Sequence, residues 1–168
     1  MEKFPQAETE LLEAISLTDG THFCALSATY SFLSEARLGL GRFGEAREAA
    51  RRGLALAQES ENDLDLGTAW RALGRVNAAD PLAGADAAKP GSANESPESA
   101  DACFESSVRI FRKIGAAGDE AATLRYWAEF EHRRGREEDA RSKANSALEI
   151  FRRLGASAEI ARTEAAVS

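Results

Sequence analysis

Histidine and cysteine, the residue types most often found at catalytic and metal sites, are scarce in this 168-residue chain. The histidines, His22 and His132, lie far apart, and neither belongs to a metal-binding spacing such as HExxH. Two arginines follow His132, and their charge would disfavour a proton or a metal ion there. The cysteines, Cys24 and Cys103, form neither a CxxC pair nor a disulfide framework. We therefore expect no metal ligand and no cofactor, and we interpret both cysteines as small buried residues.

Two further segments resemble binding motifs only superficially. The run Gly39-Leu40-Gly41-Arg42-Phe43-Gly44 fits the GxGxxG phosphate-binding pattern, but it follows a predicted helix and not a strand. We interpret it as a link between two helices. The acidic run 59–63 (ESEND) is interpreted as a solvated turn that caps the next helix. Spacing alone brings no Ser/His/Asp set together, so we expect no catalytic residue and no enzyme.

Composition favours a helical protein. Hydrophobic residues make up 43% of the chain and charged residues 29%, as in globular domains. Ala, Leu, Glu and Arg dominate, and these are strong helix formers. The net charge of −7 disfavours nucleic acid and anionic membrane surfaces as partners. With no apolar run of the roughly 20 residues that span a bilayer and no signal-peptide pattern, we expect a cytoplasmic protein.

A repeat runs along the sequence. The segment 110–116 (IFRKIGA) nearly recurs at 150–156 (IFRRLGA), a step of 150 − 110 = 40 residues. Each copy ends a predicted helix with cations in its last turn and then a glycine. Three repeat windows begin at Tyr30, Trp70 and Leu124, and a half-copy of the second helix runs from Ala7 to Leu17.

The repeat predicts paired helices in a single domain, residues 1–168. Gly41 and Gly135 are expected to end the first helix of their repeats. Residues 80–96 hold two Pro and two Gly, and we expect them to form a flexible insertion in the second repeat. Ser96 followed by Pro97 then predicts the start of the next helix. The predicted helices cover about 6–18, 22–40, 43–58, 63–79, 97–114, 118–134, 137–154 and 157–166.

The windows resemble the tetratricopeptide repeat (TPR) family, whose motif has an aromatic residue or Leu, then Leu-Gly, a glycine at the turn and Ala-Leu near the end. Trp70, Leu73 and Gly74 carry the opening of this motif, whereas Glu131 departs from it at a usual Tyr position. The resemblance implies an all-α, right-handed superhelical solenoid of antiparallel helix pairs. It would have about three full repeats, a leading half-repeat and a C-terminal capping helix. The IFRRLGA-type endings are similar to the repeat tails of bacterial signalling ATPases, including maltose-regulator-like and cyclase-linked proteins.

The resemblance also implies a concave groove lined by the first helix of each repeat. Arginine is well shaped for bidentate recognition of carboxylates, so such a groove could hold an acidic peptide or a free C-terminal carboxylate. Alternatively, these arginines pair with nearby acids in a solvated network. The residues carried over to this sequence are Ser31, Glu35, Arg71, Arg75, Arg125, Glu129, His132 and Arg133.

Three functional hypotheses follow. The first is a non-enzymatic protein- or peptide-binding scaffold in bacterial signalling or transcription regulation. The second is an oligomerisation or structural module of a larger regulator, because solenoid ends expose apolar helix faces that could form a homo-oligomer. The third is a small-molecule sensor or catalytic domain that uses the 80–96 segment as a lid.

Overall fold

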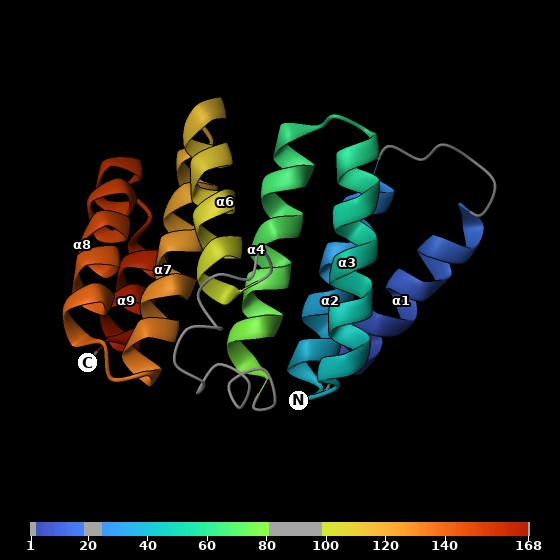
Figure 1. Cartoon of the computed structure of the whole chain (residues 1–168), viewed down its shortest axis with the longest axis horizontal. Coiled ribbons are helices and arrows are strands. Elements are labelled where there is room, and N and C mark those ends of the chain that lie inside the picture. Colours follow the sequence, from blue (N-terminus) through green and yellow to red (C-terminus); the bar gives the residue numbers. More distant parts are fainter. Residues whose placement is uncertain (1–2, 19–24, 81–98, 168) are drawn as a thin grey trace.

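The computed structural model of the chain describes residues 3–18, 25–80 and 99–167 (Figure 1). Within these ranges the chain forms eight helices and no strand, which confirms the all-α expectation. Among the described helices, none combines the length and the apolar character that crossing a bilayer requires. The helices are α1 (Lys3–Leu17), α2 (Leu26–Gly39), α3 (Phe43–Glu59), α4 (Asp63–Ala79), α6 (Ala100–Ile114), α7 (Ala117–Arg133), α8 (Glu137–Leu154) and α9 (Ser157–Ala166).

Some predicted boundaries need correction. The first helix begins at Lys3, and α2 begins only at Leu26. The side chain of Ser99 caps α6 and accepts a hydrogen bond from the backbone nitrogen of Ala102 at 3.2 Å. The predicted start at Ser96 and Pro97, nearly all of the predicted insertion (81–96), and residues His22 and Cys24 lie outside the described residues.

The helices pack in chain order, each against its neighbours in sequence (Figure 1). A second set of contacts joins alternate helices, α2 with α4, α4 with α7 and α7 with α9. We call α2, α4, α7 and α9 the A row, and α1, α3, α6 and α8 the B row. Within the described residues, the helices of the B row do not contact one another. The A row is therefore the closely packed side of the molecule.

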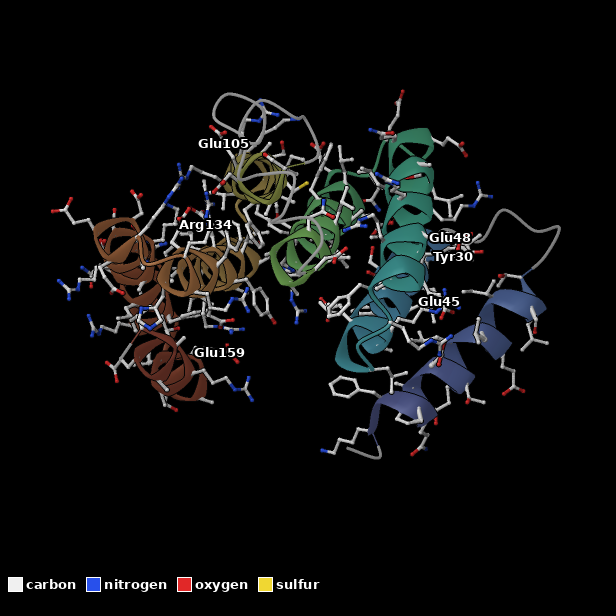
Figure 2. The ribbon with its side chains drawn as sticks, turned by 60° about the horizontal axis from the view of Figure 1, so that its bottom comes forward. Tyr30, Glu45, Glu48, Glu105, Arg134 and Glu159 are labelled. Atoms are coloured by element: carbon white, nitrogen blue, oxygen red, sulfur yellow. The ribbon has the colours of Figure 1, made fainter. Side chains whose placement is uncertain are left out.

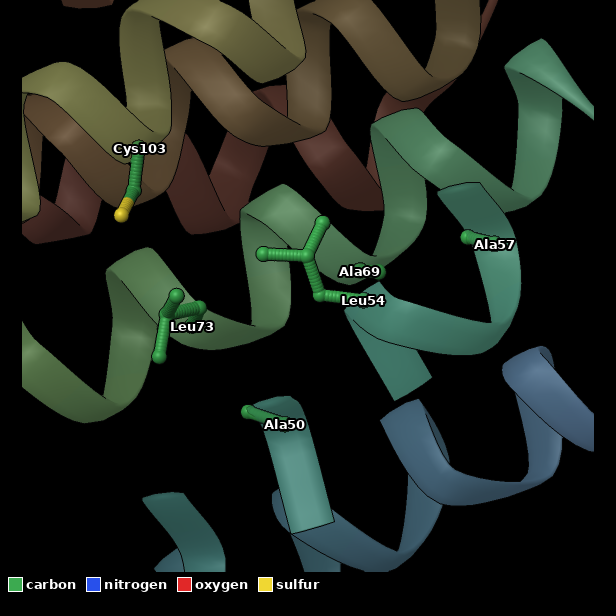
Figure 3. Packing of buried hydrophobic residues seen from close by; sticks show 6 residues of the cluster. All are labelled: Ala50, Leu54, Ala57, Ala69, Leu73 and Cys103. Atoms are coloured by element: carbon green, nitrogen blue, oxygen red, sulfur yellow. The ribbon is translucent and has the colours of Figure 1, made fainter. Parts of the chain in front are cut away.

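Small residues let the two rows approach closely. Ala50, Leu54 and Ala57 of α3 meet Ala69 and Leu73 of α4 in one buried cluster (Figure 3). Two glycines of α4 serve the contact with α6. A Cβ atom on Gly67 would lie 2.8 Å from the ring of Phe111, and one on Gly74 would lie 3.0 Å from that of Phe104.

In the described turns between consecutive helices, one residue has a left-handed backbone conformation. Gly41, Gly115, Gly135 and Gly155 have φ angles of 73°, 74°, 72° and 69°, which confirms that a glycine ends each of these helices. After α3 the same role falls to Glu61, whose φ is 52°. A residue with a Cβ atom is strained in this region, whereas glycine is not.

Replacing Glu61 with glycine is therefore expected to stabilise the protein. The Glu61→Gly variant should gain about 0.5–1 kcal/mol in free energy of unfolding, measured by urea denaturation. The matched control is Gly115→Ala, whose Cβ would have nothing within 4 Å, so only backbone strain acts. That variant should lose about 1 kcal/mol. A loss in both variants would contradict this account of the turns.

Candidate functional site

Ser31, predicted to line a groove, belongs to the core. Its side chain is 1% exposed, and its Oγ donates to the carbonyl oxygen of Ser27 at 3.1 Å. A Cβ atom on Gly53 of α3 would lie 3.1 Å from the same Oγ. Ser31 thus sits in the contact between α2 and α3, and the prediction that it lines an exposed groove is wrong.

The residues that correspond to Ser31 in the next two repeats are also largely shielded from solvent. Arg71 and Arg125 have side chains that are 13% and 11% exposed. Because the helices of the A row contact one another, this position faces a neighbouring helix and not open solvent. Both guanidinium groups therefore meet groups of the chain itself.

Arg75 and Arg125 enclose an aromatic ring. The guanidinium carbon of Arg75 lies 4.0 Å from the ring centre of Tyr126, and that of Arg125 lies 4.2 Å from it. Arg75 also binds a carboxylate oxygen of Glu35 on α2 at 2.5 Å. These cation–π and ion-pair contacts link α2, α4 and α7 to one another.

Carboxylates on the A-row helices pair with these arginines. Arg125 binds Glu129 at 2.5 Å and lies 3.5 Å from Glu159 of α9, which is labelled in Figure 2. Arg71 of α4 donates to Asp119 of α7 at 2.8 Å. We call this set the arginine ladder; its members are Glu35, Arg71, Arg75, Asp119, Arg125, Tyr126, Glu129 and Glu159. The arrangement matches the alternative in which the arginines pair within the chain.

The two remaining predicted residues lie at the end of α7. His132 is half-buried, and its Nδ1 lies 3.1 Å from a carboxylate oxygen of Glu137. Arg133 is exposed and donates to the carbonyl oxygen of Ala78 at 3.4 Å, a long hydrogen bond. Of the four predicted arginines, Arg133 is the exposed one, and its guanidinium remains accessible to a carboxylate from another molecule.

A second cluster, between α6 and α7, was missed in the sequence. The indole nitrogen of Trp127 donates to Asp101 at 2.9 Å and to Glu131 at 3.1 Å. Arg134 donates to the other oxygen of Asp101 at 2.9 Å, and Lys143 lies 4.4 Å from the Trp127 ring. The signal in the sequence was Glu131, an acid at a position that is usually aromatic in the resembled family.

The two carboxyl groups of this cluster differ in proton affinity. Glu131 is 2% exposed, and burial, reinforced by the neighbouring Asp101, raises the pKa of its carboxyl. Burial would also raise the pKa of Asp101, but hydrogen bonds from Trp127, Glu131 and Arg134 outweigh it and hold that pKa below its ordinary value. The negative charge therefore rests preferentially on Asp101, and the proton on Glu131.

Neither cluster offers a metal site. No group of three or more His, Cys, Asp or Glu side chains in the described part of the chain is arranged to hold a metal ion. Cys103 is buried in the contact between α4 and α6.

Comparison with known proteins supplies a structural likeness only. No protein-family model matches the chain, and no curated protein does. Among solved structures, the chain is similar to BtubC (BKLC) from P. vanneervenii, with a TM-score of 0.67 and 22% sequence identity. The match covers 96% of this chain and 61% of that one, so this chain spans about three fifths of that protein's length. Identity at this level shows a shared fold.

Proposed function

We propose that the chain is a TPR-like solenoid that acts as a protein- or peptide-binding scaffold, with the A row as its binding face. The observation that carries the proposal is the packing of the two rows. Helices of the A row contact one another and those of the B row do not, among the described residues. A stack packed more closely on one side bends toward that side, so the A row would form the concave face of a right-handed superhelix.

The arginine ladder supports a preformed binding face. Its ion pairs and ring contacts join α2, α4, α7 and α9, and they fix the side chains that flank them. A surface that is already ordered loses less conformational entropy when a partner binds. In this proposal the ladder holds the surface, and other residues contact the partner.

The partner would contact an exposed strip on α2 and another on α7. Phe32 is 53% exposed and lies one turn before Glu35 on α2. Arg133 lies one turn after Glu129 on α7 and is exposed. An exposed ring and an exposed guanidinium suit a peptide that carries an apolar side chain together with an acidic residue or a C-terminal carboxylate. Binding of such a peptide would suit the role in bacterial signalling or transcription regulation that is expected from the sequence.

Selection of random peptides by phage display on the immobilised chain would test this function. Affinities of the selected peptides would then be measured by fluorescence polarisation. The double variant Phe32→Ala/Arg133→Glu is expected to weaken binding about tenfold or more, which is about 1.4 kcal/mol.

The matched control is Glu48→Ala/Glu105→Arg, on exposed positions of α3 and α6 that Figure 2 labels. It should bind the peptides like the unmodified chain. Selected peptides that bind the double variant with undiminished affinity would place the binding surface elsewhere. Failure to select any peptide would count against the scaffold function itself.

A further inference from the structure

The third residue of α4, α7 and α9 is an acid in each helix, and two of these acids bind an arginine of the preceding A-row helix. Asp119 of α7 accepts a hydrogen bond from Arg71 of α4 at 2.8 Å. Glu159 of α9 lies 3.5 Å from Arg125 of α7. The acid of α4 is Asp65, and it is equivalent to Asp119 because 119 − 65 = 125 − 71 = 54. By the repeat, a cation on α2 would be expected for Asp65.

Asp65 has no such arginine. The residue of α2 that is equivalent to Arg71 is Ser31, since 71 − 31 = 40. Ser31 has a short side chain, and its Oγ already donates to the carbonyl oxygen of Ser27. Among the described residues, the Oδ2 atom of Asp65 is buried and has no hydrogen-bond partner. Of the three equivalent acids, Asp65 is therefore the one that the described chain leaves without a cation.

The surroundings of Asp65 favour a cation from outside the chain. The residue is half-buried, so its carboxylate has lost part of its hydration while one side remains accessible to solvent. Burial raises the pKa of the Asp65 carboxyl, and no neighbouring charge of the described chain opposes this rise. A partly desolvated carboxylate without a partner is stabilised by an approaching cation. Arginine suits this role best, because its planar guanidinium can donate two hydrogen bonds to one carboxylate.

We infer that Asp65 is a docking point for an arginine side chain of the peptide partner. The guanidinium of the partner would bind this carboxylate in the way that the arginine ladder binds its own acids further along the A row. The exposed ring of Phe32 lies on the adjacent helix α2, so the same peptide could place an apolar side chain there. The inference rests on the proposed function, and it adds a basic residue to the apolar and acidic groups expected of the peptide.

The position of Asp65 also sets a spacing within the peptide. Asp65 lies in the first turn of α4, whereas Arg133 bonds to Ala78 in the last turn of the same helix. The two ends are 78 − 65 = 13 residues apart, which is about 20 Å along a helix. An extended peptide covers about 3.3 Å per residue. The arginine of the peptide should therefore lie about six positions from its acidic residue or C-terminal carboxylate.

A double-mutant cycle on peptides selected by phage display tests the contact. Asp65→Asn should weaken their binding about tenfold, because a charge-assisted hydrogen bond is lost. Replacing the arginine of the peptide with citrulline, which is uncharged and of similar shape, should weaken binding to the unmodified chain equally. It should have little further effect on Asp65→Asn. The control Glu48→Gln, at an exposed position of α3, should bind like the unmodified chain. Circular dichroism would establish that each variant is folded.

A titration with N-acetyl-arginine amide needs no selected peptide. It should shift the nuclear magnetic resonance signals of Asp65, whereas N-acetyl-citrulline amide should not, and Asp65→Asn should lose the response. This response together with a failure to select any peptide would support the cation site and count against the scaffold function. Selected peptides without coupling to Asp65, or the absence of the shift, would overturn the inference and leave the scaffold function standing.

Discussion

Replacing Phe104 with alanine is expected to lower the free energy of unfolding by about 3–5 kcal/mol. Phe104 is fully buried, and it joins three helices. Its ring lies against Gly74 of α4, stacks on Trp127 at a centroid distance of 6.2 Å and is tilted against Phe130 at 6.3 Å. Truncation would remove all of these contacts and leave a cavity. Because α4, α6 and α7 are packed against one another, they cannot move far enough to fill it.

Urea denaturation followed by circular dichroism would measure this loss. Phe32→Ala is the matched control, because it deletes the same ring at a position that is 53% exposed. The control should lose less than about 1 kcal/mol. Similar losses in the two variants would show that Phe104 does not have the central place in the core assigned to it.

The helices could be predicted from the sequence because their signals are local. The predicted range 63–79 coincides with α4 (Asp63–Ala79), and 43–58 falls one residue short of α3 (Phe43–Glu59). Apolar spacing and glycine stops act within one or two turns, so they can be recognised without knowledge of the packing. Glu61 shows the limit of this signal, since a glutamate occupies the left-handed position that glycine fills after α6 and α8.

The surroundings of the candidate site could not be predicted, because they depend on packing between repeats. Arg71 and Arg125 share one position of the repeat, and the sequence indicates a similar environment for both. Whether that position faces solvent or another helix depends on how closely the A-row helices approach, and Asp119 and Glu159 come from neighbouring helices. Spacing within one repeat does not determine these distances, so the sequence predicts a groove position for Ser31 although this residue is buried.

The carboxyl pair of Asp101, which is half-buried, and Glu131, which is buried, leads to a second large effect, one that depends on pH. Replacing Glu131 with glutamine is expected to stabilise the protein at neutral pH, because the folded protein then no longer has to keep a proton on a buried carboxyl that ionises in the unfolded chain. Since the folded-state pKa of Glu131 is raised above its ordinary 4.5, the carboxyl contributes stability below that pH. This contribution is lost as the pH rises through the folded-state value. The advantage of Glu131→Gln should therefore be small near pH 4 and grow toward neutral pH.

Asp101→Asn is the matched variant, and it should show the opposite pH dependence. The folded-state pKa of Asp101 lies below its ordinary 3.8, so the ionised carboxylate stabilises the fold above that pH. This stabilisation is lost as the pH falls through the folded-state pKa. Asp101→Asn should thus destabilise the protein at neutral pH, and the loss should shrink on acidification.

Thermal unfolding of both variants and the unmodified chain between about pH 3 and 8 would measure the two trends. Opposite slopes would show that Asp101 holds the charge and Glu131 the proton, whereas slopes of the same sign would contradict that assignment. The physical reason is local: Trp127 and Arg134 direct their N–H groups at Asp101 in a way that favours its ionised form, while Glu131 is buried beside it.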